Sequence, residues 1–257
     1  MLSMDYTARV ENLMTMIEDN RILRGNWGMQ DDEGRQYACL LGALAPETVK
    51  AESAQACPAD VMPRWLAYLT PLMDDMGSDI YWPTMVRKYA DLASRWHVLD
   101  EHAWRRVEMK ARIALTWAFQ SFSKNGGVRM YAEQIRHLYM RMEGQYKPLP
   151  WEWNKLVKNS DRNSYILLRY NDLEMGIIDG LATLVTSDYD PTTTIVAIEQ
   201  LEGTAMESSS VAARNEKDMN MDTYIKMVTG IWDRLTDRVF DAITREIKEA
   251  EQKAPAA

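Results

Sequence analysis

The fold is decided by the stretch Tyr81–Phe122, which reads YWPTMVRKYADLASRWHVLDEHAWRRVEMKARIALTWAFQSF. Apolar residues recur in it at steps of three and four, the spacing that places side chains on one face of an α-helix. They are Val86, Tyr89, Leu92 and Trp96 in the first half, and Trp104, Val107, Ala111, Ala114, Ala118 and Phe122 in the second. Asp100 is suited to cap a helix N-terminus. The pattern predicts two long helices that meet near Leu99-Asp100 and supply the centre of a packed core.

The same helical spacing recurs outward from this stretch in both directions. We expect further long helices over 3–23, 60–76, 128–143, 163–185 and 222–251, with short ones at 38–44 and 190–201. The exception is 27–37, where Asp31 to Gly34 has the composition of a tight hairpin turn. The prediction is an all-α (mainly α) fold, a multi-helix bundle of about eight helices with one small β-hairpin near 27–37.

Several segments are predicted to interrupt this bundle. Residues 45–59 are rich in Ala, Pro, Glu and Ser and are predicted to form a loop, and Pro71 is predicted to kink or end the 60–76 helix. A break at 124–127, Lys-Asn-Gly-Gly, favours an N-terminal helical part, 1–122, and a C-terminal helical part, 123–257, that ends in a long amphipathic helix. A single domain is the alternative, since 257 residues fit either arrangement.

The composition bounds the class of protein. Hydrophobic residues make up 46% and charged residues 26%, as in ordinary globular proteins. Two cysteines, Cys39 and Cys57, are too few for a disulfide framework, and neither a secretory signal nor an apolar run of about 18 residues is visible. We expect a cytoplasmic protein with no membrane partner. We expect no cofactor and no metal, because the sequence has no P-loop, no G-x-G-x-x-G motif and no Cys/His cluster.

Charge is distributed unevenly along the chain. The net charge is −8, yet residues 87–169 hold 16 Lys/Arg against 8 Asp/Glu, which leaves 14 against 30 elsewhere. Such asymmetry is typical of a surface for an acidic protein partner or for nucleic acid, although acidic ends that pack on a basic middle would produce it too. The candidate binding residues are Arg87, Lys88, Arg95, Arg105, Arg106, Lys110, Arg112, Arg129, Arg136 and Arg141.

The last predicted helix carries a heptad-like apolar seam. Its members step by three and four residues and are Ile225, Val228, Trp232, Leu235 and Val239. Such a seam is typical of a helix that packs on another helix. Packing within the chain is one interpretation, and self-association or docking of a protein partner is the other.

Two segments resemble catalytic motifs but lack the surrounding sequence features that these motifs require. Asp188 begins D-x-D-x-T, a phosphatase nucleophile signature, but the 65 residues that follow Thr192 look helical rather than βα. Cys39 precedes a short predicted helix, whose N-terminus can lower a thiol pKa, and the histidines of the chain are the candidate bases. They are His97, His102 and His137. A buried structural cysteine and a helix-capping aspartate explain the same residues, so we predict no catalytic residue.

Residues 12–44 resemble a family of small uncharacterised bacterial and phage proteins. The resemblance rests on a leading helix, then W-G, D-x-x-G-R and C-x-L-G-A-L. The matching residues are Trp27, Gly28, Asp31, Gly34, Arg35, Cys39, Leu41, Gly42, Ala43 and Leu44. The resemblance implies a bacterial or phage (viral) origin and assigns no activity.

These patterns favour a non-enzymatic helical protein that acts in protein–protein interaction or assembly. It would hold an acidic partner on its basic central region. The alternatives are a nucleic-acid-binding protein that uses the basic face of 87–169, and a hydrolase that uses Cys39 or Asp188.

Overall fold

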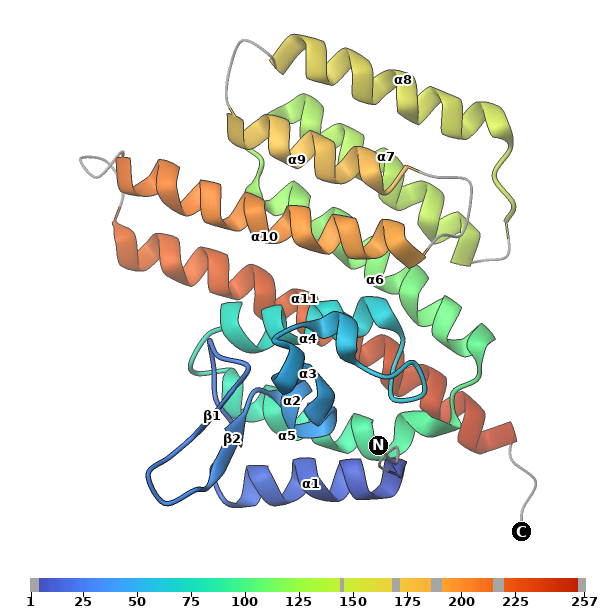
Figure 1. The fold of residues 1–257 in the computed structure, drawn as a ribbon. Helices are drawn as coiled ribbons and strands as arrows, with labels where there is room; N and C mark the ends of the chain where they lie inside the picture. Colours follow the sequence, from blue (N-terminus) through green and yellow to red (C-terminus); the bar gives the residue numbers. More distant parts are fainter. Residues whose placement is uncertain (1–4, 144–145, 168–171, 186–190, 215–219, 254–257) are drawn as a thin grey trace. The chain divides into compact units, whose positions relative to one another are not determined.

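The structure of the protein, a computed structural model, describes residues 5–143, 146–167, 172–185, 191–214 and 220–253. Within these residues it contains eleven α-helices, two short 3-10 helices and one two-stranded sheet, which confirms the predicted mainly-α fold with a small hairpin (Figure 1). The elements are α1 (Tyr6–Glu18), β1 (Gly28–Gln30), β2 (Gln36–Ala38), α2 (Leu40–Leu44), α3 (Pro46–Ala51), η1 (Ala54–Ala56), α4 (Arg64–Met76), α5 (Trp82–Arg95), η2 (Trp96–Val98), α6 (Glu101–Phe122), α7 (Gly126–Glu143), α8 (Pro150–Leu167), α9 (Asp172–Thr183), α10 (Pro191–Arg214) and α11 (Met221–Lys253).

The chain divides into two compact units. Unit 1 comprises Met1–Trp104 and Phe240–Ala257, and unit 2 comprises Arg105–Val239, so that the boundaries fall inside α6 and α11. The boundary predicted at 122/123 coincides with the turn between α6 and α7, within unit 2. A Gly-Asn break marks a turn, and a turn can join two helices of the same unit as readily as two domains.

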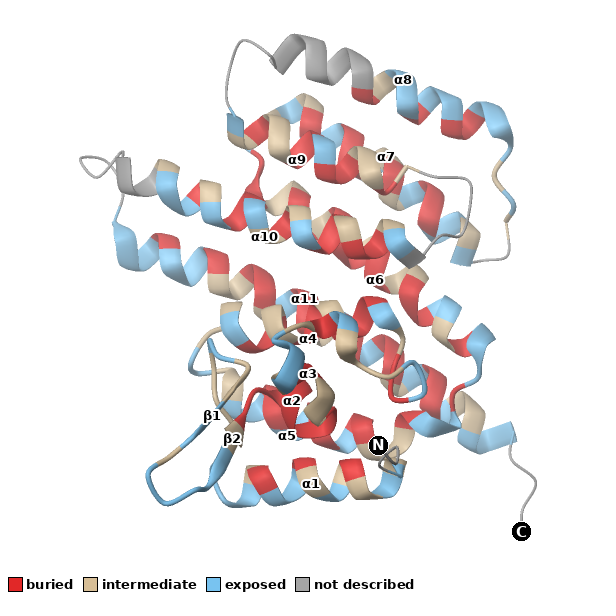
Figure 2. Cartoon of the chain, viewed as in Figure 1, coloured by how far each residue is buried: buried red, intermediate tan, exposed pale blue. Residues whose placement is uncertain are grey.

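The central prediction for 81–122 is confirmed. α5 ends at Arg95, η2 follows, and α6 begins at Glu101. Asp100 caps α6, because its Oδ1 accepts a hydrogen bond from the backbone N–H of Ala103 at 2.7 Å. In both units the long helices carry buried residues on one face and exposed residues on another, whereas the short helix α2 is buried throughout (Figure 2). In the part of the chain that the structure describes, no helix combines the length and the apolar composition that a membrane span requires.

The hairpin of unit 1 forms where the sequence placed it. β1 and β2 are antiparallel, with Met29 opposite Tyr37. Asp31 closes the turn, since its Oδ1 accepts hydrogen bonds from the backbone N–H groups of Glu33 at 3.0 Å and of Arg35 at 2.8 Å. Gly34 adopts φ +82°, a conformation that strains any residue with a Cβ. The local turn chemistry is therefore sufficient to specify this element.

One local prediction for unit 1 was wrong, and one of the two alternatives predicted for Pro71, an early end of its helix, is excluded. The predicted loop at 45–59 contains α3 and η1, because Pro46 suits the first turn of a helix and short helices need few apolar residues. Pro71 does not end its helix, because α4 continues to Met76. The side chains on either side of Pro71, Leu69 and Met73, are both buried, and their packing outweighs the one backbone hydrogen bond that proline removes.

Unit 2 is built from helices that pack side by side. α9 packs along α10 and also contacts α7 and α8. Glu174 of α9 is buried and holds the α6–α7 turn: its Oε2 accepts a hydrogen bond from the Ser123 hydroxyl at 2.5 Å, and its Oε1 accepts from the backbone N–H of Lys124 at 2.9 Å. Asn125 then caps α7, since its Oδ1 accepts from the backbone N–H of Gly127 at 2.8 Å. These contacts fix where α7 begins.

Gly180 of α9 lies against the ring of Phe119 in α6. A Cβ built on Gly180 would lie 2.3 Å from two ring atoms of Phe119, which is fully buried. We expect Gly180→Ala to destabilise the protein by about 1–3 kcal/mol, because the buried ring must move to make room. Urea-induced unfolding measures the change.

The matched control for this substitution is Gly203→Ala in α10. Nothing lies within 4 Å of a Cβ at Gly203, so the substitution should stabilise the helix by up to about 1 kcal/mol through propensity alone. A gain in stability for both variants would show that α9 and α6 are not in close contact at Gly180.

Candidate anion-binding surface around Trp117

Two arginines of α11 lie over one tryptophan of α6 within unit 2. The Cζ of Arg238 is 4.5 Å from the ring centroid of Trp117, and the Cζ of Arg234 is 5.1 Å from it. The two arginines are four residues apart and therefore share one face of α11. Trp117 is half-buried and both arginines are exposed. The indole thus holds two guanidinium groups at the surface by cation–π contact.

Arg136 of α7 adds a third positive charge to this site. Arg238 remains exposed, but partial desolvation of its guanidinium is the main cause that lowers its pKa, and the charges of Arg136 and Arg234 lower it further. Arg136 is itself held in place, because its Nη1 donates a hydrogen bond to Gln120 Oε1 at 2.6 Å. We call Trp117, Arg136, Arg234 and Arg238 the arginine–tryptophan cluster.

Among the described residues, one arginine of the arginine–tryptophan cluster forms an ion pair. Arg136 Nη2 lies 3.2 Å from Glu133 Oε1, an exposed pair of the kind that contributes little. Among the described residues, neither Arg234 nor Arg238 forms an ion pair. Guanidinium groups present a planar edge of N–H donors that matches a carboxylate or a phosphate. A bound anion would therefore relieve the mutual repulsion of three like charges.

At least half of the predicted basic residues form ion pairs within the chain. Arg87, Lys88 and Arg95 belong to unit 1, and the other seven belong to unit 2. At least five of the ten form ion pairs with the chain's own carboxylates: Arg95 with Glu251, Lys110 with Glu143, Arg112 with Glu108, Arg136 with Glu133, and Arg141 with Glu152. Arg112 is buried, whereas Arg87, Lys88, Arg105, Arg106 and Arg129 are exposed. Only Arg136 belongs to the arginine–tryptophan cluster.

The sequence interpretation missed Trp117, Arg234 and Arg238. Both arginines lie outside 87–169, the region selected by its excess of positive charge. Trp117 falls between the apolar positions Ala114 and Ala118 and was not part of the predicted stripe. Two signals pointed to them: an R-x-x-x-R spacing on the polar face of the last helix, and a tryptophan beside a stripe rather than in it.

The predicted seam of α11 lies mostly inside the chain. Val228, Trp232, Leu235 and Val239 are buried, whereas Ile225 is 51% exposed. Four of the five residues therefore contribute to the protein's own core. Within the seam, a partner would find only Ile225 at the surface.

Of the two candidate nucleophiles, the structure describes Cys39 and not Asp188. Cys39 is buried, and its Sγ accepts a hydrogen bond from the backbone N–H of Gly42 at 3.3 Å as the cap of α2. Burial raises the pKa of the Cys39 thiol to about 11, which opposes the thiolate that nucleophilic attack requires. Asp188 lies outside the described residues. The described part of the chain contains no group of three or more His, Cys, Asp or Glu residues that could hold a metal ion.

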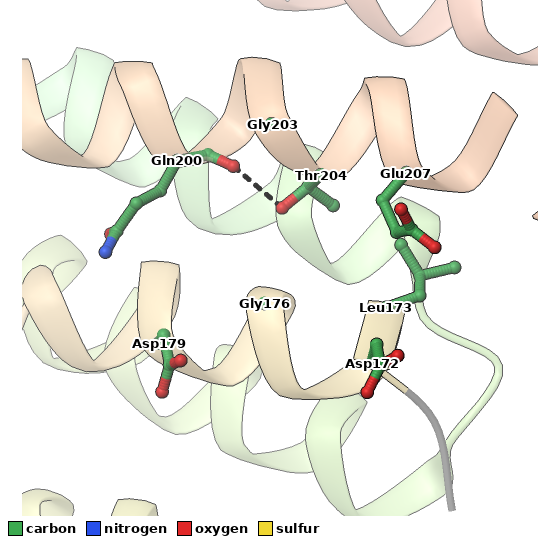
Figure 3. Close-up of a pocket in the computed structure, with 8 residues that line it drawn as sticks. All are labelled: Asp172, Leu173, Gly176, Asp179, Gln200, Gly203, Thr204 and Glu207. Carbon is green, nitrogen blue, oxygen red and sulfur yellow. Dashed lines mark hydrogen bonds between the residues drawn. The ribbon is translucent and has the colours of Figure 1, made fainter. Parts of the chain in front are cut away.

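A pocket of opposite charge lies between α9 and α10 in the same unit (Figure 3). Asp172 and Asp179 of α9 and Glu207 of α10 line it, and Gly176 and Gly203 leave it open. The hydroxyl of Thr204, which also lines the pocket, donates a hydrogen bond to the backbone oxygen of Gln200 at 2.8 Å. Carboxylates repel anions, so this pocket does not extend the arginine–tryptophan cluster.

Comparison of the chain with protein-family models, with curated proteins and with solved structures finds no match.

Proposed function

We propose that the protein is a non-enzymatic binding protein that holds an acidic protein partner on the arginine–tryptophan cluster. The observation that carries the proposal is the pair of exposed guanidinium groups on Trp117, which form no ion pair among the described residues. Aspartate and glutamate side chains of a partner would accept hydrogen bonds from their N–H edges. Stacking on the indole holds these edges in place before the partner arrives, which lowers the entropy cost of binding.

A protein partner fits this surface better than nucleic acid does. Nucleic-acid affinity depends on many phosphate contacts along an extended basic surface. At least five of the ten predicted basic residues are instead paired with the chain's own carboxylates, and the net charge of −8 repels a long polyanion. A compact cationic cluster on an acidic protein is suited to a short acidic segment.

We also propose the compartment in which the protein acts and its origin. Cys39 and Cys57 are free thiols, as is typical of proteins in a reducing compartment such as the cytoplasm. A bacterial or phage origin, which the 12–44 segment suggests, is compatible with such a setting. We place the partner on the arginine–tryptophan cluster rather than on the α11 seam, because four of the five seam residues are buried in the chain.

The test is binding of a short fluorescein-labelled poly-L-glutamate, followed by fluorescence anisotropy at low salt. We expect Arg234→Gln/Arg238→Gln to weaken its affinity at least about tenfold, because each substitution removes a charge-assisted hydrogen bond. Raising the salt concentration should weaken binding to the unsubstituted protein and have a smaller effect on the variant.

The matched control is Lys158→Gln/Lys226→Gln, which removes the same charge from exposed positions of unit 2 outside the arginine–tryptophan cluster. Its affinity should stay within about twofold of the unsubstituted protein, since distant exposed charges are screened. Equal losses in the two variants would reduce the effect to net charge and overturn the proposal. Tighter, cluster-dependent binding of a single-stranded oligonucleotide than of poly-L-glutamate would support nucleic-acid binding instead.

A further inference from the structure

A second cavity lies between α7 and α8 of unit 2 and has a different character. Its volume is about 260 Å³, and it opens to solvent. It is lined by Gln134, His137, Leu138, Arg141, Trp151, Glu152, Lys155 and Leu156. This combination of an apolar floor, an aromatic side chain and polar groups is typical of small-molecule sites.

The apolar residues of the cavity are arranged so that a flat ring can contact them. Leu138 and Leu156 are buried, whereas Trp151 is 60% exposed, a high value for the largest apolar side chain. An indole that remains exposed beside an apolar floor offers a face on which a planar ring can stack.

The acidic residue of the cavity, Glu152, already accepts hydrogen bonds from groups of the protein itself. Glu152 is buried, and its Oε1 accepts a hydrogen bond from Arg141 at 2.8 Å. Its Oε2 accepts from the Tyr146 hydroxyl at 2.5 Å and from the backbone N–H of Leu149 at 2.9 Å. The hydrogen bond from Tyr146 is the largest cause that lowers the pKa of Glu152, and the other contacts lower it further. Glu152 therefore stays ionised. Arg141 is held over the Tyr146 ring at 3.7 Å, so the charges of Arg141 and Glu152 offset each other.

The remaining polar groups of the cavity are mainly donors. Lys155 is exposed and forms no ion pair within the described part of the chain. Gln134 Oε1 accepts a hydrogen bond from Asn159 at 2.9 Å, which leaves the amide N–H groups of Gln134 for an acceptor in the cavity. His137 is exposed at the same opening. A ligand that satisfies these groups carries an anion and hydrogen-bond acceptors.

We propose that this cavity binds a small anion that carries one planar ring, no larger than a nucleoside monophosphate. The ring stacks on Trp151 over Leu138 and Leu156, and the anionic group meets Lys155. The volume supports the size limit, because sites for drug-sized ligands span roughly 300–1,000 Å³ and this cavity is smaller. The site shares no residue with the arginine–tryptophan cluster and goes beyond the binding of an acidic protein.

The test is isothermal titration of the full-length protein with AMP, UMP and indole-3-acetate, compared with adenosine and inorganic phosphate alone. At least one of the three ring-bearing anions should bind with a Kd below about 1 mM. Trp151→Ala should weaken that binding roughly tenfold or more, and Trp151→Phe should retain most of it, because a ring remains for stacking. Lys155→Met should weaken the anions and leave adenosine unchanged.

Two controls keep the site distinct from the arginine–tryptophan cluster. Lys158→Met removes an exposed charge from α8 outside the cavity, and Arg234→Gln/Arg238→Gln disables the cluster; both should bind the anion as the unsubstituted protein does. The proposal is overturned if none of the three anions binds below about 1 mM or if Trp151→Ala binds equally well. It is also overturned if adenosine or phosphate alone matches the complete ligand.

Discussion

Arg112→Met is expected to destabilise the protein by about 3–5 kcal/mol, the largest loss among the substitutions considered. Arg112 is buried, and its Nη2 lies 3.0 Å from Oε1 of Glu108, whose side chain is fully buried. The same guanidinium donates from Nε to the Thr194 hydroxyl at 2.8 Å, and that hydroxyl donates to Glu108. Methionine fills most of the volume but leaves the Glu108 carboxylate buried without its cation. Urea-induced unfolding at pH 7, followed by circular dichroism, measures the loss.

The double substitution Glu108→Gln/Arg112→Met separates charge from packing. It removes both charges, so less than half of the single variant's loss should remain. An equal loss in the two variants would show that the arginine stabilises the unit through its volume and not by neutralising Glu108. A loss below about 1 kcal/mol in the single variant would contradict the burial of this pair.

Asp74 is expected to make the stability of the protein depend on pH. Its side chain is fully buried; Oδ1 accepts a hydrogen bond from Trp82 Nε1 at 2.6 Å and Oδ2 from the backbone N–H of Leu40 at 3.3 Å. Burial, the dominant cause, raises the pKa of Asp74 from 3.8 to about 7. The folded protein therefore binds a proton that the unfolded chain has lost, and the stabilisation from this proton is complete below about pH 4 and lost as pH rises through about 7.

The measurement is the difference in unfolding free energy between the unsubstituted protein and Asp74→Asn, taken from pH 4 to pH 8. The variant cannot titrate at this position, so the difference should shift in its favour by up to roughly 4 kcal/mol as pH rises. Glu47→Gln is the control of opposite sign, because the hydrogen bond from Arg9 lowers the pKa of Glu47; its effect changes at the acid end of this range and below it, and should stay constant from pH 6 to pH 8. A difference for Asp74→Asn that does not change with pH would contradict a protonated carboxyl at this position.

The hairpin and the long helices α1, α4, α5, α6, α7 and α11 could be predicted because their signals are local, whereas the start of α8 was not predicted and α10 extends beyond the predicted 190–201. The apolar period over 81–122, the Asp100 cap and the turn at Asp31–Gly34 each specify structure within a few residues. The long last helix, predicted for 222–251, is found as Met221–Lys253. The short helix α3 and the passage of α4 through Pro71 could not be predicted, because tertiary packing outweighs local propensity there.

The candidate sites were harder to predict than the fold. A run of positive charge along the sequence does not say which charges meet carboxylates in space, and Arg95 pairs with Glu251, 156 residues away. The arginine–tryptophan cluster likewise joins α6, α7 and α11, which no local pattern connects. The exposure of Trp151 likewise has no local signal, and only the structure shows that it is 60% exposed.

The proposed function requires that an acidic partner contacts Trp117 and its arginines. The direct measurement is ¹⁹F NMR of the protein labelled with 5-fluorotryptophan, with the Trp117 resonance assigned from the spectrum of Trp117→Phe. On addition of poly-L-glutamate, the account predicts that the Trp117 resonance shifts and that salt reverses the shift. Binding of poly-L-glutamate that leaves the Trp117 resonance unmoved, or no binding at low salt, would contradict it.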